Sequence, residues 1–146
     1  MVKQLVLATA MVMVTVGIHL IGLALLVRVL RSHNRLFQRM KIIPLTLLLA
    51  ATIGIIVIHT VEIWLFAALY IELHAFQTFE QALYFSTVSY AAIGYGDVLM
   101  PHAWRIVGAI EGATGIIMLG LSTAFLISLL TQVNLLGHDW LKPDDD

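Results

Sequence analysis

Long apolar runs, separated by short polar segments, dominate the 146-residue chain. A helix that crosses a bilayer needs about 20 apolar residues, and three stretches reach this length: residues 5–27, 42–70 and 104–130. A fourth apolar stretch, residues 79–93, is too short to cross alone. The pattern therefore predicts an all-α membrane protein with three spans and one re-entrant segment that enters the membrane and returns.

The composition narrows the class of protein. The chain is 60% hydrophobic and 12% charged, which is typical of membrane proteins. It contains no cysteine, so disulfides and thiolate metal sites are not expected. The basic residues cluster between apolar segments, which argues against nucleic-acid binding. Since no nucleophile–base pairing or metal-ligand spacing stands out, we expect neither an enzyme nor a bound cofactor.

The positive charges predict the orientation of the chain. Short loops rich in Lys and Arg stay in the cytoplasm, so the N-terminus is expected outside and the C-terminus in the cytoplasm. Residues 73–102, which include the re-entrant segment, then face the exterior. The cytoplasmic loop is expected near anionic lipid head groups. Five of the eight Lys and Arg residues lie in or beside this loop: Arg28, Arg31, Arg35, Arg39 and Lys41.

The re-entrant segment ends in the residues "IGYGD", positions 93–97. Glycine adopts positive φ without steric cost, so alternating glycines let consecutive carbonyls point the same way. Four such ribbons around an axis replace the hydration shell of a potassium ion. The motif therefore predicts a homotetramer with K⁺ as its permeant ligand. The expected ion-binding carbonyls are those of Ala92, Ile93, Gly94, Tyr95 and Gly96, the first four enclosing the ion cages.

This segment resembles the pore domain of potassium channels, whose filter signature is Thr-Val-Gly-Tyr-Gly, over about residues 42–130. The resemblance extends to Tyr84 and Phe85, where the family places aromatics that brace the filter. Arg105, Gly115 and Gly120 also match positions of two-helix bacterial potassium channels. The resemblance implies passive potassium conduction in a prokaryotic plasma membrane, and a hinge or a close helix contact at Gly115.

The first span has no repeating arginines, so it is not expected to sense voltage. We expect it to pack either outside the pore or between subunits.

The chain is expected to consist of four parts. The parts are an N-terminal transmembrane helix (1–30), a basic cytoplasmic loop (31–41), an ion-channel pore domain (42–133) and a short cytoplasmic tail (134–146). The pore domain is expected to contain an outer helix (42–70), a pore helix (79–92), a filter (92–97) and an inner helix (104–133).

The inner end of the filter departs from the family. Ala91 and Ala92 stand where the family usually has two threonines, so the innermost cage lacks hydroxyl ligands. An ion there must keep water on its inner side. Two readings of the pore stay open: a potassium-selective channel, and a weakly selective monovalent cation channel or a poorly conducting channel-like subunit.

Residues around the filter have expected supporting roles. The ring of Tyr95 is expected to brace the filter. Asp97 is expected either to form an anionic outer mouth or to bond behind the filter, for example to Tyr84, and the two roles are compatible. On the third span, one helical face is expected to line the cavity and gate: Ile116, Leu119, Thr123, Ile127 and Thr131, the last two as the constriction.

Ionisable side chains inside the spans are candidates for function. Counting about 1.5 Å of rise per residue places His59 and Glu111 at similar depth, and His59 and Glu62 share a helix face. We therefore expect a buried polar contact between Glu111 and either His59 or Glu62, as a structural hydrogen bond or a proton sensor. A membrane redox subunit with His19 and His59 as haem ligands is a rival, although the count separates these residues by about 7 Å in depth.

Overall fold

The computed structural model describes residues 1–37 and 43–132. It contains four helices over these residues: α1 (Val2–Phe37), α2 (Ile43–Glu72), α3 (Phe79–Tyr90) and α4 (Arg105–Gln132). The predicted all-α fold is confirmed. The centre of the basic loop, with Arg39 and Lys41, and the tail at 134–146 lie outside the described residues.

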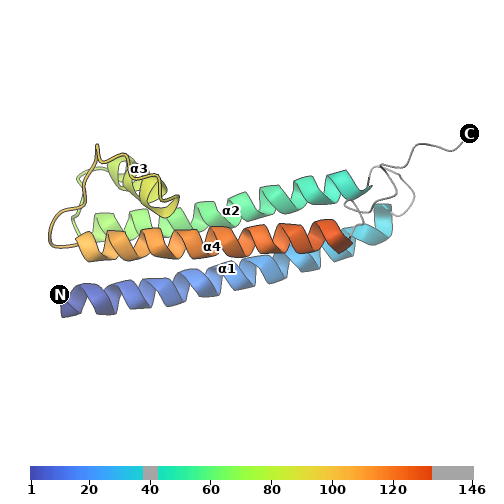
Figure 1. The fold of residues 1–146 in the computed structure, drawn as a ribbon, viewed down its shortest axis with the longest axis horizontal. Coiled ribbons are helices and arrows are strands. Elements are labelled where there is room, and N and C mark those ends of the chain that lie inside the picture. The colour runs from blue at the N-terminus through green and yellow to red at the C-terminus, as the bar shows by residue number, and fades with distance from the viewer. Residues whose placement is uncertain (38–42, 133–146) are drawn as a thin grey trace, which may run out of the picture.

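The three long helices lie side by side, with α2 antiparallel to α1 and α4 (Figure 1). Stretches of each are long and apolar enough to cross a membrane: Val2–Ser32, Leu45–Glu72 and Arg105–Gln132. Apolar side chains such as Val6, Ile56 and Ile117 remain exposed in the single chain. A lipid bilayer can cover such side chains without the cost of contact with water.

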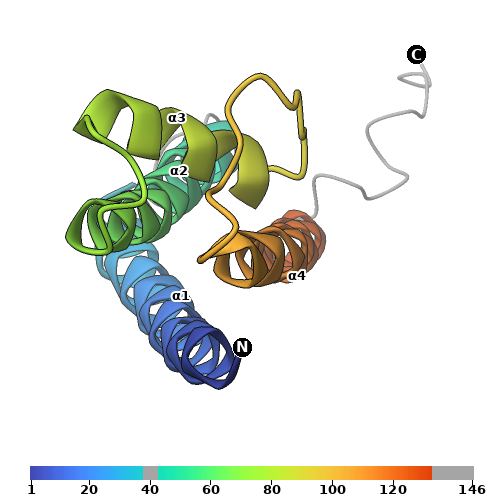
Figure 2. The same cartoon turned by 90° about the vertical axis from the view of Figure 1, so that its left-hand side faces the viewer.

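The first helix is longer than expected and packs against α2 and α4. It continues to Phe37, through residues assigned to the basic loop. A Cβ at Gly22 would lie 2.8 Å from Ile58 Cγ1, and one at Gly54 would lie 2.5 Å from Leu26 Cδ1. Each glycine thus makes room for a large side chain of the other helix. Seen end-on, α1 lies on the side of α2 and α4 away from α3 (Figure 2).

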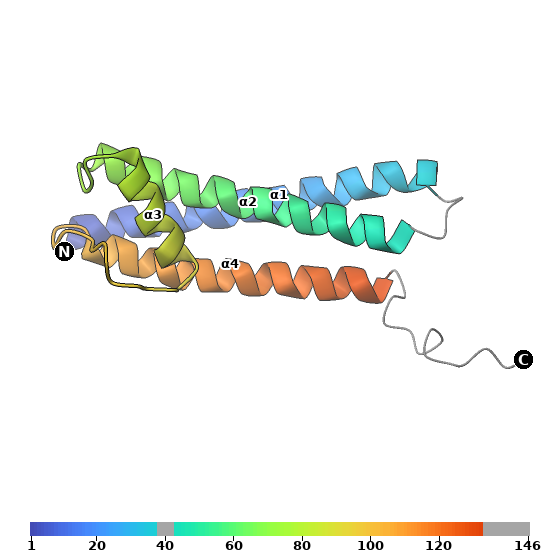
Figure 3. The ribbon, with the colours of Figure 1, turned by 90° about the horizontal axis from the view of Figure 1, so that it is seen from above.

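The short helix α3 crosses the C-terminal end of α2 and the N-terminal end of α4 (Figure 3). It begins at Phe79 because the Thr78 hydroxyl caps it, accepting a hydrogen bond from the Gln81 amide at 3.3 Å. An aromatic cluster attaches it to α2: the Phe85 ring lies 5.7 Å from Tyr70 and 5.2 Å from Phe76, between centroids. The helix ends at Tyr90, two residues earlier than expected.

Candidate ion pathway and buried polar networks

The candidate filter begins as a continuation of the end of α3. The Ala92 amide donates to Ser89 O and the Ile93 amide donates to Val88 O, both at 2.9 Å. The last carbonyl groups of a helix have no partners within the helix, and here those of Val88 and Ser89 accept these two bonds. The position of the first filter residues is therefore fixed by the pore helix itself.

The backbone of the filter alternates in conformation. Positive φ angles occur at every second residue: 55° at Ala92, 62° at Gly94 and 76° at Gly96. Gly94 and Gly96 adopt this region without penalty. Ala92 does so at a cost of about 1–2 kcal/mol, because its Cβ crowds the backbone. The repeated left-handed residues turn the chain in the way required to aim successive carbonyls to one side.

The filter is uncovered in the single chain. Residues 91–97 are all exposed, and Ile93 and Tyr95 retain 49% and 69% of their accessible surface. Irregular backbone at membrane depth is tolerated only when protein or a water-filled path surrounds it. Within one chain, the other described residues leave this ribbon open on its exposed side.

Three glycines of α4 provide the surface on which α3 rests. A Cβ at Gly115 would lie 1.9 Å from Tyr90 O, and one at Gly112 would lie 3.1 Å from Ser89 O. A Cβ at Gly108 would lie 3.0 Å from the Phe85 ring. Helix α4 runs unbroken through Gly115, so close approach accounts for this glycine. The hinge role of Gly115 is not needed to explain the described conformation.

Asp97 accepts a hydrogen bond from the Tyr84 hydroxyl at 2.6 Å. This is one of the two roles expected for Asp97. The same bond, aided by backbone N–H groups, holds the pKa of Asp97 below its ordinary value and raises the pKa of Tyr84. The carboxylate at the outer end of the filter is thus kept ionised.

The remaining predicted residues differ in their contacts within one chain. Phe85 faces the aromatic cluster and Gly108, so it fixes α3 to α2 and α4. The exposure of Tyr95 means that bracing by its ring requires a neighbouring subunit. The residues of the predicted cavity face are all exposed, as expected of a surface awaiting other subunits or water: Ile116, Leu119, Thr123, Ile127 and Thr131.

A family model described as "Ion channel" matches residues 45–132, more than half of the chain. The chain belongs to this ion channel family. It is therefore an ion channel and not an enzyme, and an integral membrane protein with three candidate spans. The channel carries an additional N-terminal helix, α1, before the matched segment. Comparisons with curated proteins and with solved structures gave no match.

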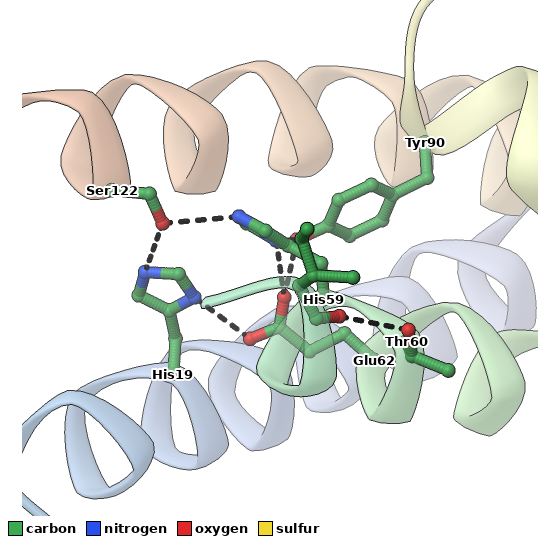
Figure 4. Close-up of polar contacts among 7 residues, drawn as sticks. His19, His59, Thr60, Glu62, Tyr90 and Ser122 are labelled. Carbon is green, nitrogen blue, oxygen red and sulfur yellow. Dashed lines mark hydrogen bonds and ion pairs between the residues drawn. The ribbon is translucent and has the colours of Figure 1, made fainter. Parts of the chain in front are cut away.

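A first buried network of this channel surrounds the fully buried carboxylate of Glu62 (Figure 4). His19 Nδ1 lies 2.9 Å from Glu62 Oε1, and His59 Nδ1 lies 3.2 Å from Glu62 Oε2. The Tyr90 hydroxyl donates to Glu62 Oε2 and lies 2.9 Å from His59 Nδ1. Ser122 Oγ contacts both imidazoles, at 3.0 Å from His59 Nε2 and 3.3 Å from His19 Nε2. All four helices of the channel contribute to this network.

A second network surrounds Glu111, also fully buried. Glu111 accepts hydrogen bonds from Tyr70 and Ser86, both at 2.5 Å. Ser86 Oγ also lies 2.9 Å from Ile63 O. These contacts join α2, α3 and α4 without α1.

The hydrogen bonds described for Glu111 do not lead to His59 or Glu62, so the expected contact is corrected. Glu62 lies ten residues before the outer end of α2, and Glu111 lies six residues after the start of α4. These counts place Glu62 about 15 Å deep and Glu111 about 9 Å deep. The carboxylates therefore occupy different levels of the channel and find different partners.

The relative depth of His19 and His59 was also predicted wrongly. Their ring centroids are 5.2 Å apart, whereas counting along the helices separated them by about 7 Å in depth alone. Hydropathy does not fix the axial position of a helix whose ends extend beyond its apolar run. Tyr70, Tyr90 and Ser122 were missed because each resembles an ordinary residue of an apolar or interfacial helix.

Proposed function

We propose that four copies of this channel assemble around a common axis and conduct potassium passively through residues 92–96. The observation that carries the proposal is the alternation of left-handed backbone at Ala92, Gly94 and Gly96. It supports a ribbon whose carbonyls face the axis and replace the hydration shell of the ion. The unpartnered surface of residues 91–97 supports assembly into a tetramer.

The proposed orientation places the filter at the outer face of the membrane. The N-terminus and α3 lie at one end of the bundle, and the C-terminal end of α1 and the N-terminal end of α2 lie at the other (Figure 1). Arg28 and Arg31 belong to the latter end, and positive charge favours the cytoplasmic side. The C-terminal end of α3 then points its partial negative charge into the membrane, where it favours a cation.

The exposed face of α4 is the proposed wall of the inner cavity. The hydroxyls of Thr123 and Thr131 bond to backbone carbonyls of their own helix, at 2.9 Å and 2.8 Å. The methyl groups of these threonines then form part of the apolar cavity wall, together with Ile116, Leu119 and Ile127. We propose that Ile127 and Thr131 form the constriction, which closes by excluding water.

A weakly selective monovalent cation pore is the second candidate, and the side chain at position 92 favours it. Alanine offers no hydroxyl to the innermost ion cage, so that cage has fewer protein ligands than in the family signature. Selectivity depends on the number and field strength of the coordinating oxygens. Fewer such oxygens reduce the discrimination between potassium and sodium.

Ion flux into liposomes that contain the pure protein distinguishes these candidates. Potassium and rubidium are expected to permeate well and sodium poorly. Equal flux of the three ions would establish the weakly selective pore, and no flux of any ion would contradict both candidates. Cross-linking in the same liposomes tests the tetramer independently.

Substitutions at position 92 test the role of the missing hydroxyl. Ala92→Ser adds a hydroxyl and is expected to raise the potassium-to-sodium permeability ratio. Ala92→Gly relieves the left-handed strain without adding a hydroxyl, and its ratio is expected to match the parent. Ala92→Thr also adds a hydroxyl, but its β-branched side chain is strained at positive φ. Identical ratios in all variants would remove the hydroxyl argument.

A further inference from the structure

The network around Glu62 brings an unusual set of donor atoms together inside the membrane. One ligand atom from each of His19, His59 and Glu62 lies within 4.8 Å of the others, and all three residues are buried. Placing ionisable groups at this depth is costly. Neutral polar side chains could make a hydrogen bond between helices at a lower free-energy cost. Hydrogen bonding between helices alone therefore does not explain why three ionisable side chains are placed here.

One arrangement of the protons leaves donor atoms free for a cation. If both imidazoles carry a proton on Nε2, facing Ser122, then both Nδ1 lone pairs face the Glu62 carboxylate. His19 Nδ1 and Glu62 Oε1 are then two acceptors 2.9 Å apart. A cation bound between them would account for this short separation.

We propose that His19, His59 and Glu62 form a binding site for a divalent transition-metal ion of the zinc class. Two imidazole nitrogens and a carboxylate oxygen are a donor set that Zn²⁺ prefers, and imidazole also suits copper and nickel. The Tyr90 oxygen, 2.9 Å from His59 Nδ1, is the fourth donor. The positive charge of the ion would lie beside the Glu62 carboxylate.

The second set of contacts fits this assignment. A histidine that binds a metal through one nitrogen normally donates its other N–H to an oxygen. With the metal on both Nδ1 atoms, both Nε2–H groups donate to Ser122 Oγ, which has two lone pairs for them. Metal–ligand bonds of about 2.0–2.1 Å place tetrahedral ligands about 3.3 Å apart. The separations of 2.9 Å from His19 Nδ1 to Glu62 Oε1 and 3.2 Å from His59 Nδ1 to Glu62 Oε2 are close to this value, and one ligand atom of each residue lies within 4.8 Å of the others.

The site would attach α1 to the pore. His19 lies outside the segment that the ion channel family matches, residues 45–132, while His59, Glu62 and Tyr90 lie within it. Metal binding that depends on the folded arrangement stabilises that arrangement. The inference does not rest on potassium selectivity, so it stands or fails separately from the proposed function.

Cobalt substitution tests the site in the intact protein. The purified tetramer is stripped with a chelator and then titrated with Co²⁺, whose visible absorption is strong in tetrahedral and weak in octahedral coordination. We expect one Co²⁺ per chain, a tetrahedral spectrum and its displacement by Zn²⁺. Thermal unfolding measured with Zn²⁺ and with chelator is expected to give a higher Tm with the metal.

A thiolate gives a signature specific to this position. The chain has no cysteine, so His19→Cys introduces the sole thiol, with its sulfur close to the place of Nδ1. The Co²⁺ complex of this variant is expected to show an added sulfur-to-metal charge-transfer band. His74→Cys, at an exposed histidine, is the matched control and is expected to leave the spectrum unchanged.

A further variant separates metal binding from folding. Glu62→Gln keeps an oxygen for His19 and adds an N–H for the rest of the network, so the fold is retained. It removes the charged ligand, and Co²⁺ affinity is expected to fall by more than about 100-fold, beyond the loss usual for second-shell changes. An absence of stoichiometric Co²⁺ in the parent, an octahedral spectrum, or equal affinity in Glu62→Gln would overturn the site and leave the cluster as a hydrogen-bonded network.

Discussion

The two buried carboxylates of this channel differ in the partners that surround them. Glu111 receives two hydroxyl groups, and one of these, that of Ser86, has a second acceptor at Ile63 O. Glu62 receives a hydroxyl and two imidazoles, which in turn share Ser122. The partners described for the Glu111 carboxyl group are thus hydroxyls, whereas those of the Glu62 carboxyl group also include two imidazole rings.

The difference indicates separate roles for the two levels of the channel. The Glu111 network joins the three helices of the pore domain, while the Glu62 network adds α1 through His19. A tyrosine takes part in both, Tyr70 in the first and Tyr90 in the second. Because Tyr90 precedes the proposed filter by two residues, a change at Glu62 would have a short route to the proposed ion pathway.

Replacing each carboxylate with leucine should produce the largest difference between the networks. Glu62→Leu removes the acceptor of two imidazoles and a tyrosine, and a cost of about 3–5 kcal/mol is typical of breaking a buried charged group of this kind. Glu111→Leu strands the Tyr70 hydroxyl but leaves Ser86 its bond to Ile63 O, so about 2 kcal/mol is expected. Thermal unfolding of the purified channel measures both losses of stability. Equal losses would show that the networks are equivalent.

Crowding the contact beneath Tyr90 should come next in size. A Cβ at Gly115 would lie 1.9 Å from Tyr90 O, whereas one at Gly120 meets nothing within 4 Å. Gly115→Ala should therefore cost about 3 kcal/mol as an overpacking change and should reduce conduction by displacing the end of α3. Gly120→Ala is the control in the same thermal and flux measurements. A Gly115→Ala channel of parental stability would contradict the close approach.

Removing the hydroxyl of Tyr70 or of Tyr90 should cost less stability, and the two variants should differ in ion flux. Tyr70→Phe and Tyr90→Phe each delete one hydrogen bond to a carboxyl group, at about 2 kcal/mol. Only Tyr90→Phe is expected to change ion flux as well, because Tyr90 leads directly into the filter. Flux per assembled tetramer separates this effect from lost stability, and parental flux in Tyr90→Phe would contradict the coupling.

The exposed carboxylate of Asp97 should show the smallest effect. Its pKa is lowered chiefly by the Tyr84 hydrogen bond, so its charge is present above the ordinary pKa and is lost only as the pH falls through the lowered one. Acid on the side of the membrane that Asp97 faces is expected to reduce ion flux as Asp97 is protonated. Tyr84→Phe is expected to shift the midpoint of this inhibition to higher pH. Asp97→Asn, which cannot titrate, should abolish this component, and an unchanged midpoint in Tyr84→Phe would count against the bond.

The sequence was sufficient for the candidate spans, the short helix and the alternating backbone of residues 92–96, because each has a local signal. Apolar run length identifies a span, and the spacing of Gly94 and Gly96 identifies alternating backbone. The partners of Glu62 and Glu111 depend instead on the axial offset between helices. An offset of a single turn, about 5.4 Å, exchanges one set of neighbours for another, and hydropathy leaves such an offset undetermined.

The close contact between Tyr90 and Gly115 limits which substitutions the channel tolerates at position 115. Position 115 has room for hydrogen alone while Tyr90 O stays where it is, so a larger residue there requires α3 to withdraw from α4. Withdrawal would also lift the Tyr90 hydroxyl from Glu62 and move the ribbon that begins at Ala92. Adding one methyl group at position 115 would thus disturb both the contacts of Glu62 and the proposed ion pathway. A second mutation that restores function is best sought among the residues of α3 that contact α4.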